Sequence, residues 1–120
     1  MPTASGHTKA IRATKVTGSH VYDNAGEKIG KIEDVVLDKS TNKIMFAVMS
    51  VGGAVTTSEN HYAVPWSVLD FSEEKDGYVM PCNRDQVSKG PSDLSTDLTK
   101  NDGAKYRELA YKHYGVAKDW

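Results

Sequence analysis

The stretch that decides the fold is residues 43–51, which read KIMFAVMSV. Side chains alternate between the two faces of an extended chain, so every second residue points the same way. One face carries the apolar residues Ile44, Phe46 and Val48, and the other face carries the apolar residues Met45, Ala47, Met49 and Val51. A strand with two apolar faces is typical of the centre of a sheet, so we predict a central strand covered on both sides.

Upstream of this strand, a tight turn precedes a second, bent strand. Residues 23–26 (DNAG) predict the turn, in which Asn24 and Gly26 supply left-handed conformations. Residues 27–38 (EKIGKIEDVVLD) predict the strand, and Gly30 within it indicates a bulge or the close approach of another backbone. Residues 11–16 are mixed in character and predict a short strand or an extended lead-in.

Downstream, Gly52 and Gly53 end the central strand. Residues 62–64 predict a short strand that stops at Pro65, because proline cannot donate a hydrogen bond to a sheet. Trp66 then begins a single helical turn.

The next residues continue this pattern of short elements. An Asp-Gly pair at the end of residues 73–77 predicts a hairpin loop between two short strands, and residues 84–89 predict one or two helical turns. Short strands joined by hairpins are typical of a mainly β protein built as a small antiparallel barrel or sandwich.

The last third of the chain predicts an amphipathic helix over residues 105–114, with Asn101 as a plausible N-cap and Gly115 just beyond its end. A helix of this length is unstable alone, so it must pack on its own barrel or on a second subunit, and the sequence leaves both open. The predicted packed stripe consists of Tyr106, Leu109, Ala110 and His113.

These patterns divide the chain into four parts. We predict a flexible N-terminus at residues 1–10, a barrel domain at 11–90, a polar linker at 91–100, and the helix with its tail at 101–120. At 120 residues, 38% hydrophobic and 26% charged, the chain has the composition of one soluble globular domain.

The charge is unevenly distributed along the chain. Residues 1–22 carry three basic residues and no acidic one, whereas residues 23–120 carry 12 basic and 16 acidic residues. An acidic body argues against tight nucleic-acid binding, which needs a basic face, and the basic arm is read as a solvated tail. The longest apolar run, residues 44–49, is far short of a membrane span, and the N-terminus lacks a signal-peptide pattern, so we expect a cytoplasmic protein.

Reaction chemistry finds little support. The lone Cys82 excludes an internal disulfide, and it could meet His61 or His113 only through the fold, so a small buried hydrophobe is the favoured interpretation. The histidines lack metal-ligand spacing, and the acidic residues 73–76 lack the alternation of a calcium loop. We therefore expect no catalytic residue, no metal and no cofactor.

Three segments, in this order, carry a resemblance to a known family. They are residues 21–35 (VYDNAGEKIGKIEDV), Val51-Gly52-Gly53 and Ala63-Val64-Pro65-Trp66. Together they resemble the PRC-barrel domain, named for the cytoplasmic domain of the photosynthetic reaction centre H subunit. A related domain forms the C-terminal half of a ribosome maturation factor.

The resemblance covers residues 11–90, and the tyrosine-rich helix resembles extensions of stand-alone bacterial members. It implies a small, partly open barrel that serves as a docking or assembly module, with no shared catalytic residues. Residues 56–60 (TTSEN) depart from the hydrophobic segment that many relatives have there.

The function we expect is that of a non-enzymatic protein-interaction module with an unidentified protein partner. Self-association as a homodimer is plausible because an open barrel has strand edges that need covering. Candidate interface residues are Tyr111, Tyr114 and Trp120, since tyrosine and tryptophan are enriched in interfaces. The alternative is a small-molecule or ion sensor, with the loop at residues 53–62 and the acidic hairpin at a barrel mouth.

Overall fold

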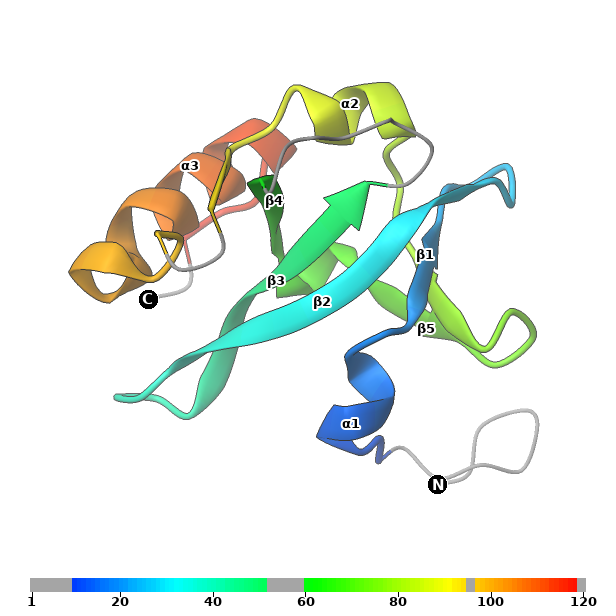
Figure 1. Ribbon diagram of the computed structural model, residues 1–120, viewed down its shortest axis with the longest axis horizontal. Coiled ribbons are helices and arrows are strands. Elements are labelled where there is room, and N and C mark those ends of the chain that lie inside the picture. The colour runs from blue at the N-terminus through cyan, green and yellow to red at the C-terminus, as the bar shows by residue number, and fades with distance from the viewer. Residues whose placement is uncertain (1–9, 52–59, 95–96, 119–120) are drawn as a thin grey trace.

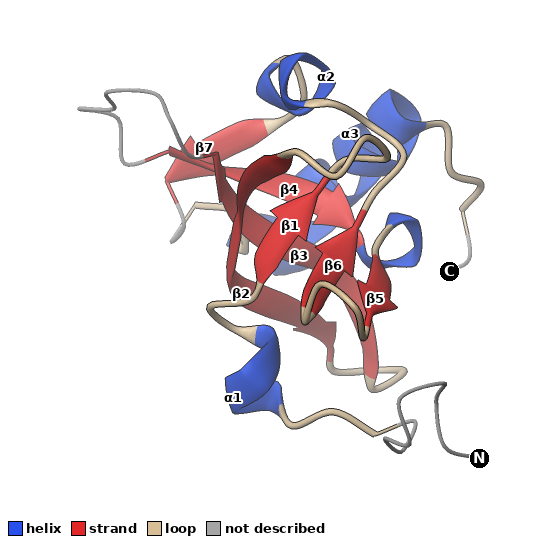
Figure 2. Cartoon of the chain, turned by 90° about the vertical axis from the view of Figure 1, so that its right-hand side faces the viewer, coloured by secondary structure: helices blue, strands red, loops and turns tan. Residues whose placement is uncertain are grey.

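The computed structural model describes residues 10–51, 60–94 and 97–118 of the 120-residue chain. Within these ranges, seven strands form one sheet in the order β5-β6-β1-β2-β3-β4-β7 (Figures 1 and 2). The strands are β1 (His20–Tyr22), β2 (Lys28–Asp38), β3 (Lys43–Val51), β4 (Asn60–Pro65), β5 (Asp70–Ser72), β6 (Gly77–Val79) and β7 (Ser92–Leu94). Because β5 and β7 remain separate edges, the predicted partly open barrel is confirmed.

One strand pair departs from the predicted antiparallel arrangement. β1 and β6 are parallel, with Val21 opposite Tyr78, whereas every other described pair is antiparallel. The reason is the path of the chain: after β4 it returns to the far side of the sheet. There the hairpin formed by β5 and β6 joins β1 rather than its sequence neighbours.

Three α-helices and two 3₁₀ turns complete the described residues: α1 (Ala13–Val16), η1 (Trp66–Val68), α2 (Arg84–Ser88), η2 (Lys100–Gly103) and α3 (Ala104–Tyr114). The extended lead-in predicted for residues 11–16 is wrong, because α1 occupies this region. The helical turn places Val16 in the core at 5% exposure, and the Gly18 N–H that follows donates to the Ile32 carbonyl.

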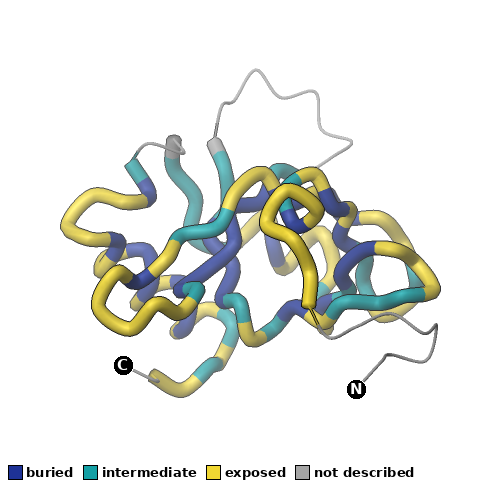
Figure 3. The backbone as a smooth tube through the Cα atoms, turned by 90° about the horizontal axis from the view of Figure 1, so that it is seen from below, coloured by how far each residue is buried: buried dark blue, intermediate teal, exposed yellow. Residues whose placement is uncertain are grey.

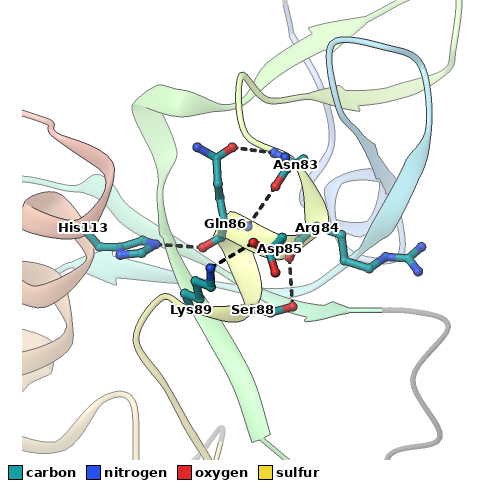
Figure 4. Close-up of polar contacts among 7 residues, drawn as sticks. All are labelled: Asn83, Arg84, Asp85, Gln86, Ser88, Lys89 and His113. Atoms are coloured by element: carbon teal, nitrogen blue, oxygen red, sulfur yellow. Dashed lines mark hydrogen bonds and ion pairs between the residues drawn. The ribbon is translucent and has the colours of Figure 1, made fainter.

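The short helix α2 confirms the prediction for residues 84–89. Its N-terminus carries a capping box, in which the Asn83 side chain accepts from the Gln86 N–H and the Gln86 side chain accepts from the Asn83 N–H. Figure 4 shows these contacts and also His113, which reaches from α3 to the Gln86 carbonyl at 2.8 Å. Two helices distant in sequence are therefore joined by a polar contact.

The barrel interior is filled by apolar side chains from β1, β2, β3, β4, β6, α1 and α2 and from the segments that connect them. They include Val21, Ile29, Ile32, Ala47, Met49, Val64, Tyr78, Met80 and Val87. Tyr78 sits between two aromatic rings, with ring centroids 5.4 Å from Trp66 and 5.3 Å from Phe71. This packing is the first of two cores.

The second core lies on the other face of β3, beneath α3. It consists of Met45, Phe46, Val48, Ala63, Leu98, Tyr106 and Ala110. The run from Met45 to Met49 is buried throughout and contributes to both cores, which confirms the prediction of a central strand covered on both sides. Figure 3 shows this buried centre beneath exposed loops.

The glycines of the predicted motif that lie in the described residues have clear roles. A Cβ atom at Gly30 would lie 1.9 Å from the Ser50 carbonyl oxygen, so the predicted close backbone approach is confirmed. Gly26 has a φ of +85°, as the turn requires. The left-handed conformation predicted for Asn24 is wrong, because Asn24 does not have a positive φ. Gly52 and Gly53 lie outside the described residues.

Residues 92–100 are not simply the polar linker that the sequence predicts. Residues 92–94 form β7, which pairs with β4 in an antiparallel register that places Asp93 opposite His61. The preceding Pro91 carbonyl accepts from the Ala63 N–H at 3.1 Å. This three-residue edge strand forms because it pairs with β4, which is distant in sequence. The polar residues of the segment itself do not indicate a strand.

Helix α3 packs on β4 and β3 of its own barrel, which settles the question that the sequence left open (Figure 1). Its predicted end at Gly115 is confirmed by a φ of +68°. The predicted N-cap at Asn101 is wrong, because the N-cap is Gly103. With a left-handed φ of +73°, Gly103 lets the chain turn sharply onto β3, and a Cβ atom added to it would be 3.3 Å from the Met45 sulfur.

The face that α3 buries is rotated from the predicted stripe. Leu109 is 42% exposed and His113 is exposed, whereas Arg107 and Tyr111 are buried together with the predicted Tyr106 and Ala110. The cause is polar: Arg107 turns inward to form an ion pair with Asp38. Hydrophobic periodicity alone does not reveal that an arginine belongs to the packed face.

Candidate functional site

A groove of about 600 Å³ lies between the β2–β3 hairpin and η2. We call it the hairpin groove. Its apolar lining consists of Val35, Val36, Leu37, Met45 and Val48, and its polar lining of Asp34, Asp38, Lys39, Ser40, Thr99 and Asp102. The groove therefore combines an apolar floor with a polar rim.

The local geometry of β2 brings an apolar side chain to the surface at this place. The pairing of β2 with β3 has an irregularity between Val36 and Leu37. A bulge re-aims the side chains that follow it. Val36 packs against the second core, whereas Leu37 is 56% exposed. Leu37 is the most exposed large hydrophobic residue among those that the structure describes.

One wall of the groove is held by a buried ion pair. The Arg107 Nη1 lies 3.0 Å from the Asp38 Oδ2, and the Asp38 Oδ1 accepts from the backbone N–H groups of Ser40 and Thr41. The Ser40 N–H first, and then the Arg107 guanidinium, lower the pKa of Asp38 from its ordinary value of 3.8. Asp38 is thus ionised and neutralised by α3, which fixes the helix against the hairpin.

The remaining charges give the rim an acidic character. Asp34 and Asp102 are exposed carboxylates. Lys39 is the one cationic side chain among the described residues that line the groove. The groove suits an apolar side chain accompanied by a positive charge, because the rim carboxylates attract a cation without the cost of full burial.

The predicted interface tyrosines are not gathered on one exposed surface. Tyr111 is 3% exposed, so the prediction that it lies off the packed face is wrong. Tyr114 is half-buried against the barrel core, and Trp120 lies outside the described residues. The apolar residues that are exposed are instead Ile11, Leu37 and Leu109 in the described part of the chain.

Tyr114 reaches a corner of the barrel near Cys82 and Tyr62. Its hydroxyl is buried and has no hydrogen-bond partner among the described residues. Burial, followed by the neighbouring Cys82 and Tyr62, raises the pKa of the Tyr114 phenol. Burial also raises the pKa of the Cys82 thiol.

This corner does not assemble the cysteine–histidine pair that the sequence allows. The His113 Nε2 contacts the Gln86 carbonyl, and no hydrogen bond within the described ranges joins Cys82 to His61 or His113. A nucleophilic cysteine needs a stabilised thiolate, whereas burial here favours the neutral thiol. The arrangement fits packing better than catalysis.

Two smaller cavities are lined mainly by polar residues. One, of about 380 Å³, lies between α1 and the acidic hairpin, where the Lys15 Nζ is 2.8 Å from the Asp76 Oδ2. The other, of about 250 Å³, lies beside α3, where the Tyr106 hydroxyl donates to Asp93, a contact that raises the pKa of Tyr106 to about 12. In both cavities an internal contact already engages the charged groups named here.

The hairpin that the sensor hypothesis needs is thus tied to α1 through Asp76. Most of the loop at residues 53–62 lies outside the described residues. Within the described ranges, no group of three metal-ligating side chains occurs, and no helix has the length and apolar character that crossing a membrane requires. Within the described residues, the barrel interior is filled by buried apolar side chains.

Sequence reasoning missed the hairpin groove. Its walls come from residues 34–48 and 99–102, which only the fold brings together. The one available signal was the uneven apolar pattern of residues 27–38, which indicated a distorted strand without showing that Leu37 faces outward.

The sequence matches the model of one protein family. The family model of the PRC-barrel domain matches residues 9–87, about two-thirds of the chain. No curated protein matches the sequence. The matched range includes β1 to β6 and all of α2 except its last residue, and α3 lies beyond it. The chain therefore belongs to the PRC-barrel domain family.

Proposed function

We propose that this PRC-barrel domain is a non-enzymatic docking module that binds a protein partner through the hairpin groove. The observation that carries the proposal is Leu37, which is 56% exposed beside an apolar floor. An apolar groove with a polar rim has the anatomy of a protein interface, whose centre excludes water while its edge remains solvated.

The attachment of α3 supports this proposal. Helix α3 covers β3 and β4 but leaves the apolar lining contributed by β2 accessible in the groove. The Asp38–Arg107 pair holds the hairpin wall of the groove against α3. A groove that is largely formed before binding costs less ordering entropy when the partner arrives.

Point variants test this proposal better than removal of residues 101–120. Truncation would uncover Phe46 and Ala63 in the second core and would endanger the fold. Leu37→Asp places a charge in the groove at an exposed position. Leu109→Asp is a matched control, because Leu109 is 42% exposed on α3 and does not line the groove.

The experiment is quantitative cross-linked capture from native cytosol with wild type, Leu37→Asp and Leu109→Asp as baits. Burying a leucine side chain is worth about 1.5–3 kcal/mol, so Leu37→Asp should reduce capture of the partner about tenfold or more. Leu109→Asp should retain it. Equal capture by all three baits would refute the groove as the docking surface.

The absence of enzymatic chemistry is part of the same proposal. Cys82→Ala removes the one thiol of the chain, and it should leave capture unchanged. If Cys82→Ala abolished an activity of the purified protein while leaving its fold intact, the non-enzymatic part of the proposal would be wrong.

A further inference from the structure

The hairpin groove has a complement elsewhere on the same chain. Ile11 is 39% exposed, and Arg12, next to it, is also exposed. Arg12 has an extended backbone, with φ −78° and ψ 143°, and its side chain makes no ion pair within the described residues. These two neighbours present an apolar side chain together with a cation, which is the combination that suits the groove.

The charge distribution of the chain points in the same direction. Residues 1–22 carry three basic residues and no acidic one, whereas the remainder has a net charge of −4. Arg12 is one of those three bases, and Asp34 and Asp102 of the acidic remainder lie on the groove rim. One copy of the chain therefore carries both halves of a complementary contact.

The two halves do not meet within one chain. Neither Ile11 nor Arg12 lines the hairpin groove of its own copy. Figure 1 shows α1 and the β2–β3 hairpin as separate features on the lower side of the molecule. Because both lie on that side, a two-fold axis can place the segment of each copy in the groove of the other, and such reciprocal contacts close at the dimer.

We infer that the occupant of the hairpin groove is a second copy of this chain, with Ile11 against the apolar floor and Arg12 beside Asp34. This inference rests on the proposed function, since it names the partner of the same groove. Two of the three exposed large hydrophobic residues in the described ranges, Ile11 and Leu37, become covered in such a dimer.

A charge exchange tests the inference. Sedimentation velocity over a concentration series should show that the purified wild type self-associates. Arg12→Glu and Asp34→Arg, each alone, place like charges together and should each weaken self-association about fivefold to tenfold, as expected for a partly exposed pair. In an equimolar mixture of the two variants, opposite charges meet at both contacts of the mixed dimer, because the exchanged pair forms at one contact and the original Arg12–Asp34 pair forms at the other. The mixture should therefore associate more tightly than either variant alone.

The same restoration is expected within one chain in the double variant, Arg12→Glu with Asp34→Arg. Each copy then carries the exchanged pair, so opposite charges meet at both contacts of the dimer. This double variant should self-associate at close to wild-type affinity, although each single variant does not.

Leu37→Asp supplies a second line of evidence and should weaken self-association about tenfold or more, whereas Leu109→Asp should not. All the substituted residues are exposed, and thermal unfolding will show that each variant is folded. A wild type that remains monomeric, or a double variant that fails to restore association, would overturn the inference.

The two proposals fail in different ways. Suppose that the wild type is monomeric, and that it captures another protein which the Leu37→Asp bait fails to capture. The second copy is then the wrong occupant, and the groove is still a docking surface. If Leu37→Asp changes neither self-association nor capture, both proposals are wrong.

Discussion

The barrel interior and the face beneath α3 are both built on β3, but they are closed in different ways. The interior is closed by sheet, α1 and α2, and side chains such as Ile32 and Met80 are fully buried. The face beneath α3 is closed by one helix of 11 residues, which leaves the hairpin groove beside it. One strand can thus serve a sealed core on one side and an accessible surface on the other.

The means of closure differ as well. Hydrogen-bonded strand pairing and apolar packing close the interior. On the other face, polar contacts fix the helix at defined points: Arg107 with Asp38, and Tyr106 with Asp93. We therefore expect the interior to govern global stability and the helix attachment to govern the shape of the groove.

The largest effect should come from Gly30→Ala, which disturbs the sealed side. Its Cβ would lie 1.9 Å from the Ser50 carbonyl oxygen, so β2 and β3 would have to separate there. We expect a loss of at least about 5 kcal/mol in the free energy of unfolding, measured by urea denaturation.

Gly18→Ala is the control for this prediction. Gly18 has a φ of +87° but no atom within 4 Å of the position that a Cβ would take, so it isolates backbone strain from steric overlap. Its cost should be only about 1–2 kcal/mol. Equal losses for the two variants would show that close packing at Gly30 is not the important feature.

A smaller effect is expected when each core loses one large side chain. Met80 and Leu98 are both fully buried, Met80 in the interior and Leu98 beneath α3. Met80→Ala and Leu98→Ala should each cost about 3 kcal/mol. Hydrogen exchange should separate them: Leu98→Ala should accelerate exchange in α3 more than in β1 and β2, whereas Met80→Ala should affect the whole sheet. The same exchange pattern in both variants would contradict the division into two cores.

Much of the sealed side could be predicted from sequence because its signals are local. The alternating apolar residues 44–49 indicated the central strand, and Gly30 indicated a close approach that steric geometry confirms. The accessible side could not be predicted in the same way. Arg107 is buried through an ion pair with a residue 69 positions away, and Leu37 faces outward because of an irregularity in strand pairing.

Acid should weaken the attachment of α3 through Asp38. A carboxyl whose pKa is lowered in the folded state stabilises the fold above its ordinary pKa of 3.8, and this contribution is lost as the pH falls below that value. Asp38→Asn should therefore be less stable than wild type at pH 7, and the difference should shrink in urea unfolding experiments below pH 3.8. Asp70→Asn, on the edge strand β5, is the control and should follow the wild type throughout.

The most direct test of the groove is photo-cross-linking of the full chain with a photoreactive phenylalanine analogue in place of Leu37 or, as control, Leu109. These positions are similarly exposed, at 56% and 42%, but only Leu37 lines the groove. We predict a cross-linked product from position 37 and little from position 109, with residues 11 and 12 of a second copy in the cross-linked peptide. Equal yields from both positions, or none from position 37, would contradict the assignment of the groove as the docking surface.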